Sequence, residues 1–148
     1  STKVITRKWL ASLALIFAED VLNLKPNTHS PSCTFPDIKY ESTWTRLIIT
    51  KICKLGIMGV DKNGIKPLKN FRPNALVTRN EFITIISRMI YDGKNNVSLS
   101  SSMHRYEKHI TAIEKIKLLS KIPTRITESV TIDIFNYIKN NMDIVDRN

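Results

Sequence analysis

The sequence predicts an all-helical fold. Five stretches carry apolar residues every three or four positions, a spacing typical of amphipathic helices, and turn-rich segments separate them. With 148 residues, 42% hydrophobic and 24% charged, the chain can build the core of one domain or of a few small repeats. Only four glycines and six prolines argue against a disordered or collagen-like chain. Short β-pairings within the loops remain compatible with this pattern.

The first two helices are expected over residues 5–22 and 44–55. In the first, Leu10, Leu13, Ala14, Phe17 and Val21 share one face. A loop rich in turn formers follows at 25–33. In the second, Trp44, Ile48, Ile52 and Leu55 share one face, and Gly56 is expected to end the helix as a left-handed cap.

A third helix is expected over residues 77–90, after an irregular connection at 57–76. Thr78 and Glu81 have the spacing of an S/T-x-x-E capping box, in which the two side chains accept hydrogen bonds from backbone N–H groups at the helix start. Arg79 then lies in the first turn, where the positive end of the helix dipole disfavours a cation.

Two further helices are expected near the C-terminus. One spans about 103–119 after a loop at 92–102, turns Tyr106, Ile110, Ile113 and Ile116 inward, and ends before Pro123. The other, near 127–140, buries Ile134, Phe135 and Ile138.

The helices form an internal repeat of helix, loop and Thr-initiated helix. Ile5-Thr6-Arg7 aligns with Val77-Thr78-Arg79, and Ile126-Thr127 aligns with Val77-Thr78. The predicted divisions are residues 1–32 as the C-terminal half of repeat 1, 33–97 as a complete repeat 2, and 98–148 as a shortened repeat 3 with a tail. We expect one compact unit with the three Thr-initiated helices in its centre.

The complete repeat resembles an S-layer homology module. The pattern of that family is F-x-D, a Trp, an apolar helix ending in Gly-Ile, a glycine-containing loop with F-x-P, and then I-T-R-x-E. The matching residues are Phe35, Asp37, Trp44, Ile48, Ile49, Ile52, Gly56, Ile57, Gly59, Asn63, Gly64, Phe71, Pro73, Val77, Thr78, Arg79 and Glu81. The resemblance implies an all-α, pseudo-threefold assembly of helix–loop–helix repeats with long loops.

The outer repeats depart from this pattern. Repeat 3 lacks the glycine-rich loop, has Lys117 where a glycine belongs, and has Glu128 where the arginine belongs. Repeat 1 has Trp9 in place of the capping glutamate, and the loop at 64–71 in repeat 2 is longer than usual.

The resemblance implies a function in the cell envelope. Modules of this kind anchor S-layer or surface proteins by binding an anionic secondary cell-wall polysaccharide, often pyruvylated, in grooves between repeats. For this chain it implies an extracellular location at the envelope, possible self-association into a surface lattice, no cofactor and no catalysis.

The predicted glycan-binding residues are Arg79, Trp44, Asp37, Arg7 and Gly59. An acidic group bound at Arg79 would relieve its unfavourable position, and a guanidinium grips a carboxylate through two hydrogen bonds. Trp44 would offer a sugar platform and Asp37 an acceptor for hydroxyls.

Structural roles remain open for each of these residues. Arg79 would serve equally as a brace between repeats, for example to Asp37 or Glu81. A tryptophan is more often part of a core. Gly56 and Gly59 fit a helix cap and a tight turn, and Thr78 with Glu81 fits a helix start.

Two cysteines, Cys33 and Cys53, are compatible with buried thiols in a reducing compartment or with one disulfide in an exported protein. Because the resemblance implies export, and because the F-x-D segment should fold back over the second helix, we predict that they form a disulfide. No metal site is expected.

The net charge of +10 favours polyanionic partners. A basic helical nucleic-acid-binding protein is therefore one alternative, although the lysines share no obvious helix face and no nucleic acid is expected as partner. A protein–protein scaffold of the surface layer, without glycan binding, is another.

An enzyme is not expected, since no catalytic motif occurs. His29, His104 and His109 are expected at the surface. No apolar run is long enough for a transmembrane segment.

Overall fold

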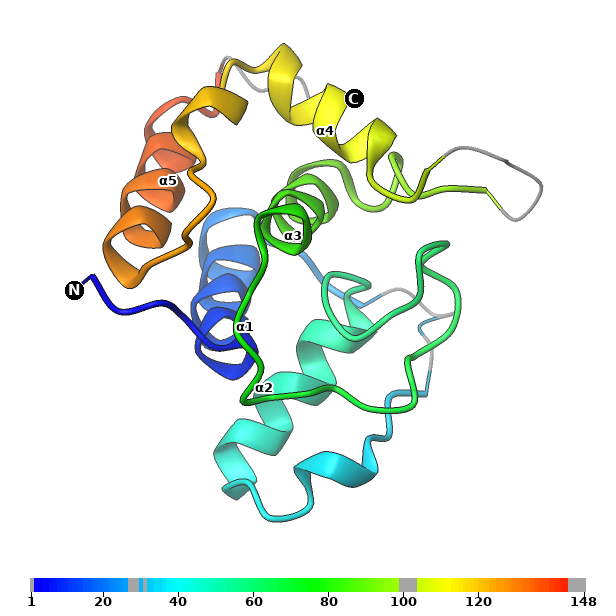
Figure 1. Cartoon of the computed structure of the whole chain (residues 1–148). Coiled ribbons are helices and arrows are strands. Elements are labelled where there is room, and N and C mark those ends of the chain that lie inside the picture. Colours follow the sequence, from blue (N-terminus) through cyan, green and yellow to red (C-terminus); the bar gives the residue numbers. More distant parts are fainter. Residues whose placement is uncertain (1, 27–29, 31, 99–103, 144–148) are drawn as a thin grey trace. The chain divides into compact units, whose positions relative to one another are not determined.

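The computed structural model describes residues 2–26, 30, 32–98 and 104–143, and this part of the chain is all-α (Figure 1). The helical fold class is thus confirmed. Two isolated antiparallel bridges pair Val4 with Thr127 and Val60 with Pro67 within the loops. No helix in the described part of the chain is long and apolar enough to cross a bilayer.

The chain divides into two compact units. Unit 2 is Thr6–Ala75, and unit 1 combines Ser1–Ile5 with Leu76–Asn148. The boundary between Ala75 and Leu76 falls inside the predicted repeat 33–97, so the compact units and the predicted repeats are different divisions of the chain.

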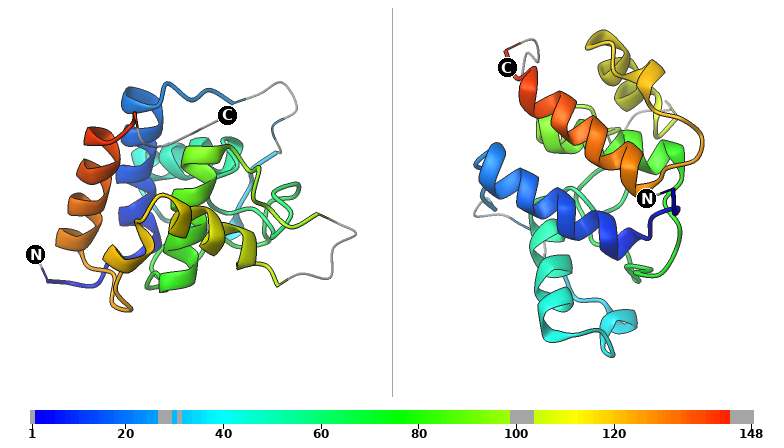
Figure 2. Two further views of the ribbon diagram at one scale, coloured as in Figure 1. Left: turned by 90° about the horizontal axis from the view of Figure 1, so that it is seen from above. Right: turned by 90° about the vertical axis from the view of Figure 1, so that its left-hand side faces the viewer.

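Unit 2 contains two main helices that pack together across each other (Figure 2). They are α1 (Arg7–Ile16), which continues into the π-helical turn η1 (Phe17–Val21), and α2 (Thr43–Lys54). The short 3-10 helix η2 (Pro36–Ile38) precedes α2. Both main helices agree closely with the predicted ranges.

The apolar faces of these helices form the core of unit 2. Leu10, Ala11 and Ala14 of α1 and Ile49 and Ile52 of α2 are completely buried. Burying a side chain of the size of Ile or Leu stabilises a fold by about 1.5–3 kcal/mol. This shared face fixes α2 against α1 and leaves the opposite face of α2 exposed.

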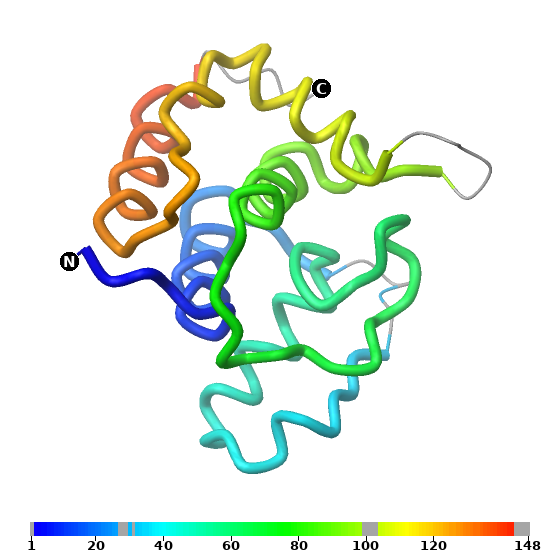
Figure 3. The backbone as a smooth tube through the Cα atoms, in the orientation of Figure 1, coloured from blue at the N-terminus to red at the C-terminus, as the bar shows by residue number. Residues whose placement is uncertain are grey.

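The connection that follows α2 is long and irregular, as predicted (Figure 3). Gly56, at φ +74°, ends α2 with a Schellman motif, in which Gly56 N donates to Cys53 O and Ile57 N donates to Ile52 O. The predicted left-handed cap at Gly56 is confirmed.

Unit 1 contains α3 (Arg79–Tyr91), α4 (Glu107–Lys115), the 3-10 helix η3 (Leu119–Lys121) and α5 (Glu128–Asn140). Every residue of α3 from Phe82 to Ile90 is buried, so this helix forms the centre of the unit. The rings of Phe82 and Phe135 lie 6.4 Å apart, which joins α3 to α5.

α4 is shorter than the predicted helix over 103–119. It ends at a second Schellman motif, in which Lys117 N donates to Glu114 O and Leu118 N donates to Ile113 O. Lys117 has φ +59°, the left-handed conformation that glycine adopts at the end of α2. Met103, the first residue of the predicted helix, lies outside the described residues.

Three backbone segments meet in unit 1. Val77 N donates to Ile5 O, and Ile5 N donates to Ile126 O, each at 3.1 Å. These three residues each precede one of the helix-capping threonines Thr6, Thr78 and Thr127, so the segments that the sequence aligned are joined by hydrogen bonds.

Candidate functional site

Four of the residues in the sequence motif of unit 2 surround Phe71, which is completely buried. We call Phe71 together with Arg7, Phe35, Asp37 and Gly59 the Phe71 hub. Its members come from α1, the segment before α2, and the connection after α2, so it fixes three parts of unit 2 to one another.

Asp37 holds the backbone around Phe71. Its Oδ1 accepts a hydrogen bond from Phe71 N at 3.0 Å, and its Oδ2 accepts one from Arg72 N at 2.8 Å. Arg72 has φ +60°, an unfavourable conformation for a residue with a side chain, and the two bonds to a carboxylate offset this cost. Asp37 is itself exposed and retains lone pairs for further donors.

Arg7 binds Phe71 from the start of α1. Its Nε donates to Phe71 O at 2.8 Å, and its guanidinium carbon lies 5.0 Å from the centroid of the Phe71 ring. Arg7 is only 8% exposed, so its charge is stabilised by the carbonyl and by the ring face. In this position Arg7 acts within the fold.

Gly59 allows two aromatic rings to meet. A Cβ at this position would lie 2.9 Å from Phe35 Cζ and 3.1 Å from Phe71 Cδ1, and the φ of +79° also favours glycine. Phe35 and Phe71 pack edge to face with centroids 5.6 Å apart. The glycine is buried, in agreement with the backbone role that the sequence left open.

Arg79 occupies the equivalent position in unit 1. Its Nε donates to Ile122 O at 2.8 Å and its Nη2 donates to Leu119 O at 3.1 Å, so it braces the start of α3 against the segment before α5. The acceptors are backbone carbonyls, whereas the brace considered from the sequence used a carboxylate. Among the described residues, its Nη1 has no hydrogen-bond partner.

The predicted helix start at Thr78 is confirmed. Thr78 Oγ1 accepts a hydrogen bond from Glu81 N at 3.2 Å, and the Thr78 hydroxyl also contacts Glu81 Oε1 at 3.2 Å. Thr6 and Thr127 cap α1 and α5 through the same bond, from Trp9 N and Val130 N. All three aligned threonines therefore start a helix in one way.

Trp44 is a large apolar residue that is 69% exposed. The sequence placed it in register with Ile48 and Ile52, but those two residues are buried and Trp44 is not. Trp44 lies in the first turn of α2, one turn before Ile48, and the buried part of the apolar face begins at Ile48 and does not reach Trp44. Its ring is open to a ligand.

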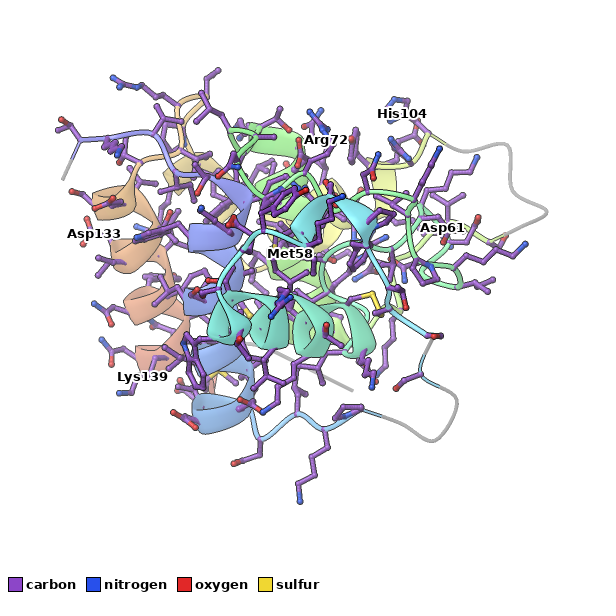
Figure 4. The ribbon with its side chains drawn as sticks, turned by 90° about the horizontal axis from the view of Figure 1, so that it is seen from below. Met58, Asp61, Arg72, His104, Asp133 and Lys139 are labelled. Carbon is purple, nitrogen blue, oxygen red and sulfur yellow. A yellow bond between two sulfur atoms is a disulfide. The ribbon has the colours of Figure 1, made fainter. Side chains whose placement is uncertain are left out.

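The predicted disulfide is present in the structure. Cys33 and Cys53 are bonded, with their Cα atoms 6.1 Å apart, and the S–S bond is visible near the C-terminal end of α2 (Figure 4). Cys53 is completely buried in α2. The bond ties the segment that carries Phe35 and Asp37 to the helix that carries Trp44.

The predicted surface position of His109 is wrong. His109 was expected at the surface but is completely buried, with Nδ1 2.8 Å from Ser87 Oγ. Burial, together with the charge of Arg88, lowers the pKa of His109 from 6.5 to about 4. The polar and charged neighbours of His109 along the sequence favoured an exposed position. Its helical spacing from Tyr106 and Ile113 placed it on the inward face and was the signal that could have predicted its burial. His104 is exposed, as expected, and His29 lies outside the described residues.

Comparisons with known proteins add no relative. No protein-family model, no curated protein and no solved structure matches this chain.

Proposed function

We propose that this chain is a non-catalytic anchoring module of the cell envelope, part of an S-layer or surface protein, that binds an anionic polysaccharide, with a pyruvylated polymer as one form. The observation that carries the proposal is Trp44, a tryptophan 69% exposed on a helix that is otherwise fixed by a buried face and a disulfide. An open indole on a rigid support suits stacking on a sugar ring, and the net charge of +10 suits an acidic polymer.

We also propose that the chain is built from S-layer homology repeats in a pseudo-threefold arrangement. Three recurrences support it: the threonine caps, the Schellman motifs at Gly56 and Lys117, and the arginines at positions 7 and 79 that bond to backbone carbonyls. The hydrogen bonds among Ile5, Val77 and Ile126 give further support.

The disulfide supports an extracellular location. Disulfides persist in oxidising compartments and are rare in the cytosol. It also makes nucleic acid an improbable natural partner, despite the charge.

The test is a binding titration with polysaccharide purified from the source envelope, against duplex DNA at matched ionic strength. Trp44→Ala should weaken polysaccharide binding about tenfold, a loss of about 1.4 kcal/mol that corresponds to one stacking contact. Its melting temperature should stay close to that of the parent, because the side chain is exposed. Ile132→Ala, at a residue 45% exposed on α5, is the matched control and should bind like the parent.

A surface-layer scaffold without glycan binding is the second candidate, and one observation favours it. Arg7 and Arg79, the residues predicted to bind the glycan, both donate to backbone carbonyls of the chain itself. A parent that fails to bind envelope polysaccharide, yet self-associates in sedimentation velocity, would favour the scaffold and exclude the anchoring function.

A further inference from the structure

The exposed side of α2 and the residues just before it carry an unusual combination of aromatic and basic side chains. Tyr40 is 90% exposed, Trp44 69% and Leu47 44%. Four exposed cations accompany them. We call this set the η2–α2 face, and its members are Lys39, Tyr40, Trp44, Arg46, Leu47, Lys51 and Lys54.

Helix geometry places most of this set in one stripe. Positions 47, 51 and 54 are separated by three or four residues, so their side chains lie on one side of α2, and position 44 lies at the edge of this side, one turn before the buried Ile48. The stripe covers about 15 Å of helix. α2 faces the viewer in Figure 4.

The two ends of the face are held in place before any ligand arrives. Lys39 Nζ lies 4.8 Å from the centroid of the Tyr40 ring, and Arg46 donates to Lys39 O at 3.4 Å and to Thr43 Oγ1 at 3.2 Å. Ser42 caps α2 through Thr45 N at 3.0 Å, and Cys53 is fixed by the disulfide. A surface fixed in this way loses little entropy on binding.

The charge of the face is one-sided. Residues 36–54, from the start of η2 to the end of α2, contain four cations and two acids, Asp37 and Glu41. Asp37 accepts hydrogen bonds from Phe71 N and Arg72 N. Glu41 is paired with Lys8 at 2.9 Å and its side chain is only 17% exposed, so it offers little repulsion to an approaching anion. The face therefore complements a polymer that carries acidic groups.

We infer that the η2–α2 face is the surface on which the chain docks an acidic polysaccharide, with Tyr40 joining Trp44 as a platform for sugar rings while Lys39 and Arg46 bind its acidic groups. This inference rests on the proposed function and assigns polysaccharide binding to a surface made by α2 and the residues between η2 and α2. Open rings alternating with cations suit a polymer with both apolar ring faces and charges. Leu47 is the single exposed aliphatic residue of the face, too few for firm insertion into lipid, and the disulfide favours a compartment without nucleic acid.

The experiment measures binding to polygalacturonate, which carries a carboxylate on each sugar, and to neutral dextran. The test variant is Lys39→Glu/Arg46→Glu. The matched control is Lys115→Glu/Lys139→Glu, which reverses two exposed cations of unit 1 and so changes the net charge equally. Circular dichroism checks folding, and Lys39→Gln/Arg46→Gln replaces the test variant if charge reversal unfolds it.

We expect the parent to bind polygalacturonate more tightly than dextran. The test variant should bind about tenfold more weakly than the parent, and the control less than threefold more weakly, since it loses only the general attraction of the net charge. Tyr40→Ala should weaken binding about fivefold with an unchanged melting temperature, as expected for a side chain that contributes only to stacking.

The remaining outcomes overturn the inference in distinguishable ways. Equal loss in the two double variants, with parental binding intact, removes the η2–α2 face as the docking surface and leaves the proposed function standing. A parent that binds neither polygalacturonate nor envelope polysaccharide overturns both. Binding to duplex DNA or to phosphatidylglycerol vesicles that depends on Lys39 and Arg46, without polysaccharide binding, assigns the face to another partner.

Discussion

Arg7 in unit 2 and Arg79 in unit 1 each follow a capping threonine, and each donates through Nε to a backbone carbonyl at 2.8 Å. Their surroundings differ. The carbonyl that Arg7 binds belongs to a loop also held by Asp37 and by the Phe35 ring. The loop that Arg79 binds ends in a short 3-10 turn, and its carbonyls at 119 and 122 are both bonded to the guanidinium.

The difference separates two kinds of residue in the motif. A threonine caps α1, α3 and α5 alike, and an arginine follows it in α1 and α3, whereas Glu128 follows Thr127 in α5. The threonine is therefore the shared start of the three helices, and the arginine is an additional brace of α1 and α3. Phe35 and Asp37, which lie before α2, and Gly59 and Phe71, which lie in the long connection after it, belong to unit 2. The motif of this chain thus describes mainly architecture, and the exposed Trp44 is its exception.

The most severe test of the comparison is removal of the hub itself. Phe71→Ala should destabilise unit 2 by about 3–5 kcal/mol, because it removes a fully buried ring that contacts Phe35 and Arg7. Urea unfolding gives the total loss, and hydrogen exchange with mass spectrometry locates it. We expect faster hydrogen exchange across residues 35–75, with exchange in α5 much less affected. Equally faster exchange in both units would contradict the assignment of the Phe71 hub to the stability of unit 2.

Arg7 and Arg79 should contribute different amounts to the stability of the fold. Arg7→Ala should cost about 3 kcal/mol, since it removes a charged hydrogen bond and a buried cation–π contact and leaves a cavity. Arg79→Ala should cost about 1.5 kcal/mol, because the half-buried side chain leaves carbonyls that water can reach. Equal losses in chemical denaturation would contradict the ranking. An Arg79→Ala variant with parental stability and lost polysaccharide binding would instead favour Arg79 as a glycan ligand.

Lowering the pH should destabilise unit 1 because it contains the buried His109. Its pKa of about 4 in the folded chain lies below the 6.5 of an exposed histidine, so the unfolded state takes up a proton first as pH falls. The associated stability is fully present above about pH 6.5 and is lost as pH falls toward 4. Between pH 7 and pH 5 the loss should be about 2 kcal/mol. His109→Gln should lack this part of the pH dependence; an identical pH profile in both proteins would show that His109 is not the group responsible.

The smallest expected effect compares the two helix ends. Lys117→Gly should stabilise the chain by about 1 kcal/mol, because glycine adopts φ +59° without the cost that a side chain brings. Gly56→Ala should destabilise it by a similar amount, because alanine is strained at φ +74°. No additional steric cost is expected, since a Cβ there would have no heavy atom within 4 Å. Opposite shifts in melting temperature support equivalent roles for the two positions, and shifts of the same sign contradict them.

The sequence predicted the helices well because their ends carry local signals. Thr78 with Glu81 and Gly56 act within a few residues of themselves, so their roles can be inferred without the fold. Arg79 could not be assigned in this way, because its partners are backbone carbonyls forty residues away that no side-chain pattern reveals. The exposure of Trp44 was not predicted because helical periodicity shows which side a residue faces, but not where the packing partner ends. The burial of His109 was missed because its polar side chain was given more weight than its place on the inward face of the helix.

Under the proposed anchoring function, the disulfide has a mechanical consequence. A force that pulls on both sides of the disulfide would extend the parts of the chain that unfold. The segment between Cys33 and Cys53 would not extend, because the covalent bond between the two cysteines transmits the force instead. Its 20 residues of sequence separation would otherwise add roughly 70 Å of contour length. Under tension the chain therefore lengthens less, and the segment between Cys33 and Cys53, which contains every residue of the η2–α2 face except Lys54, carries no force along its backbone.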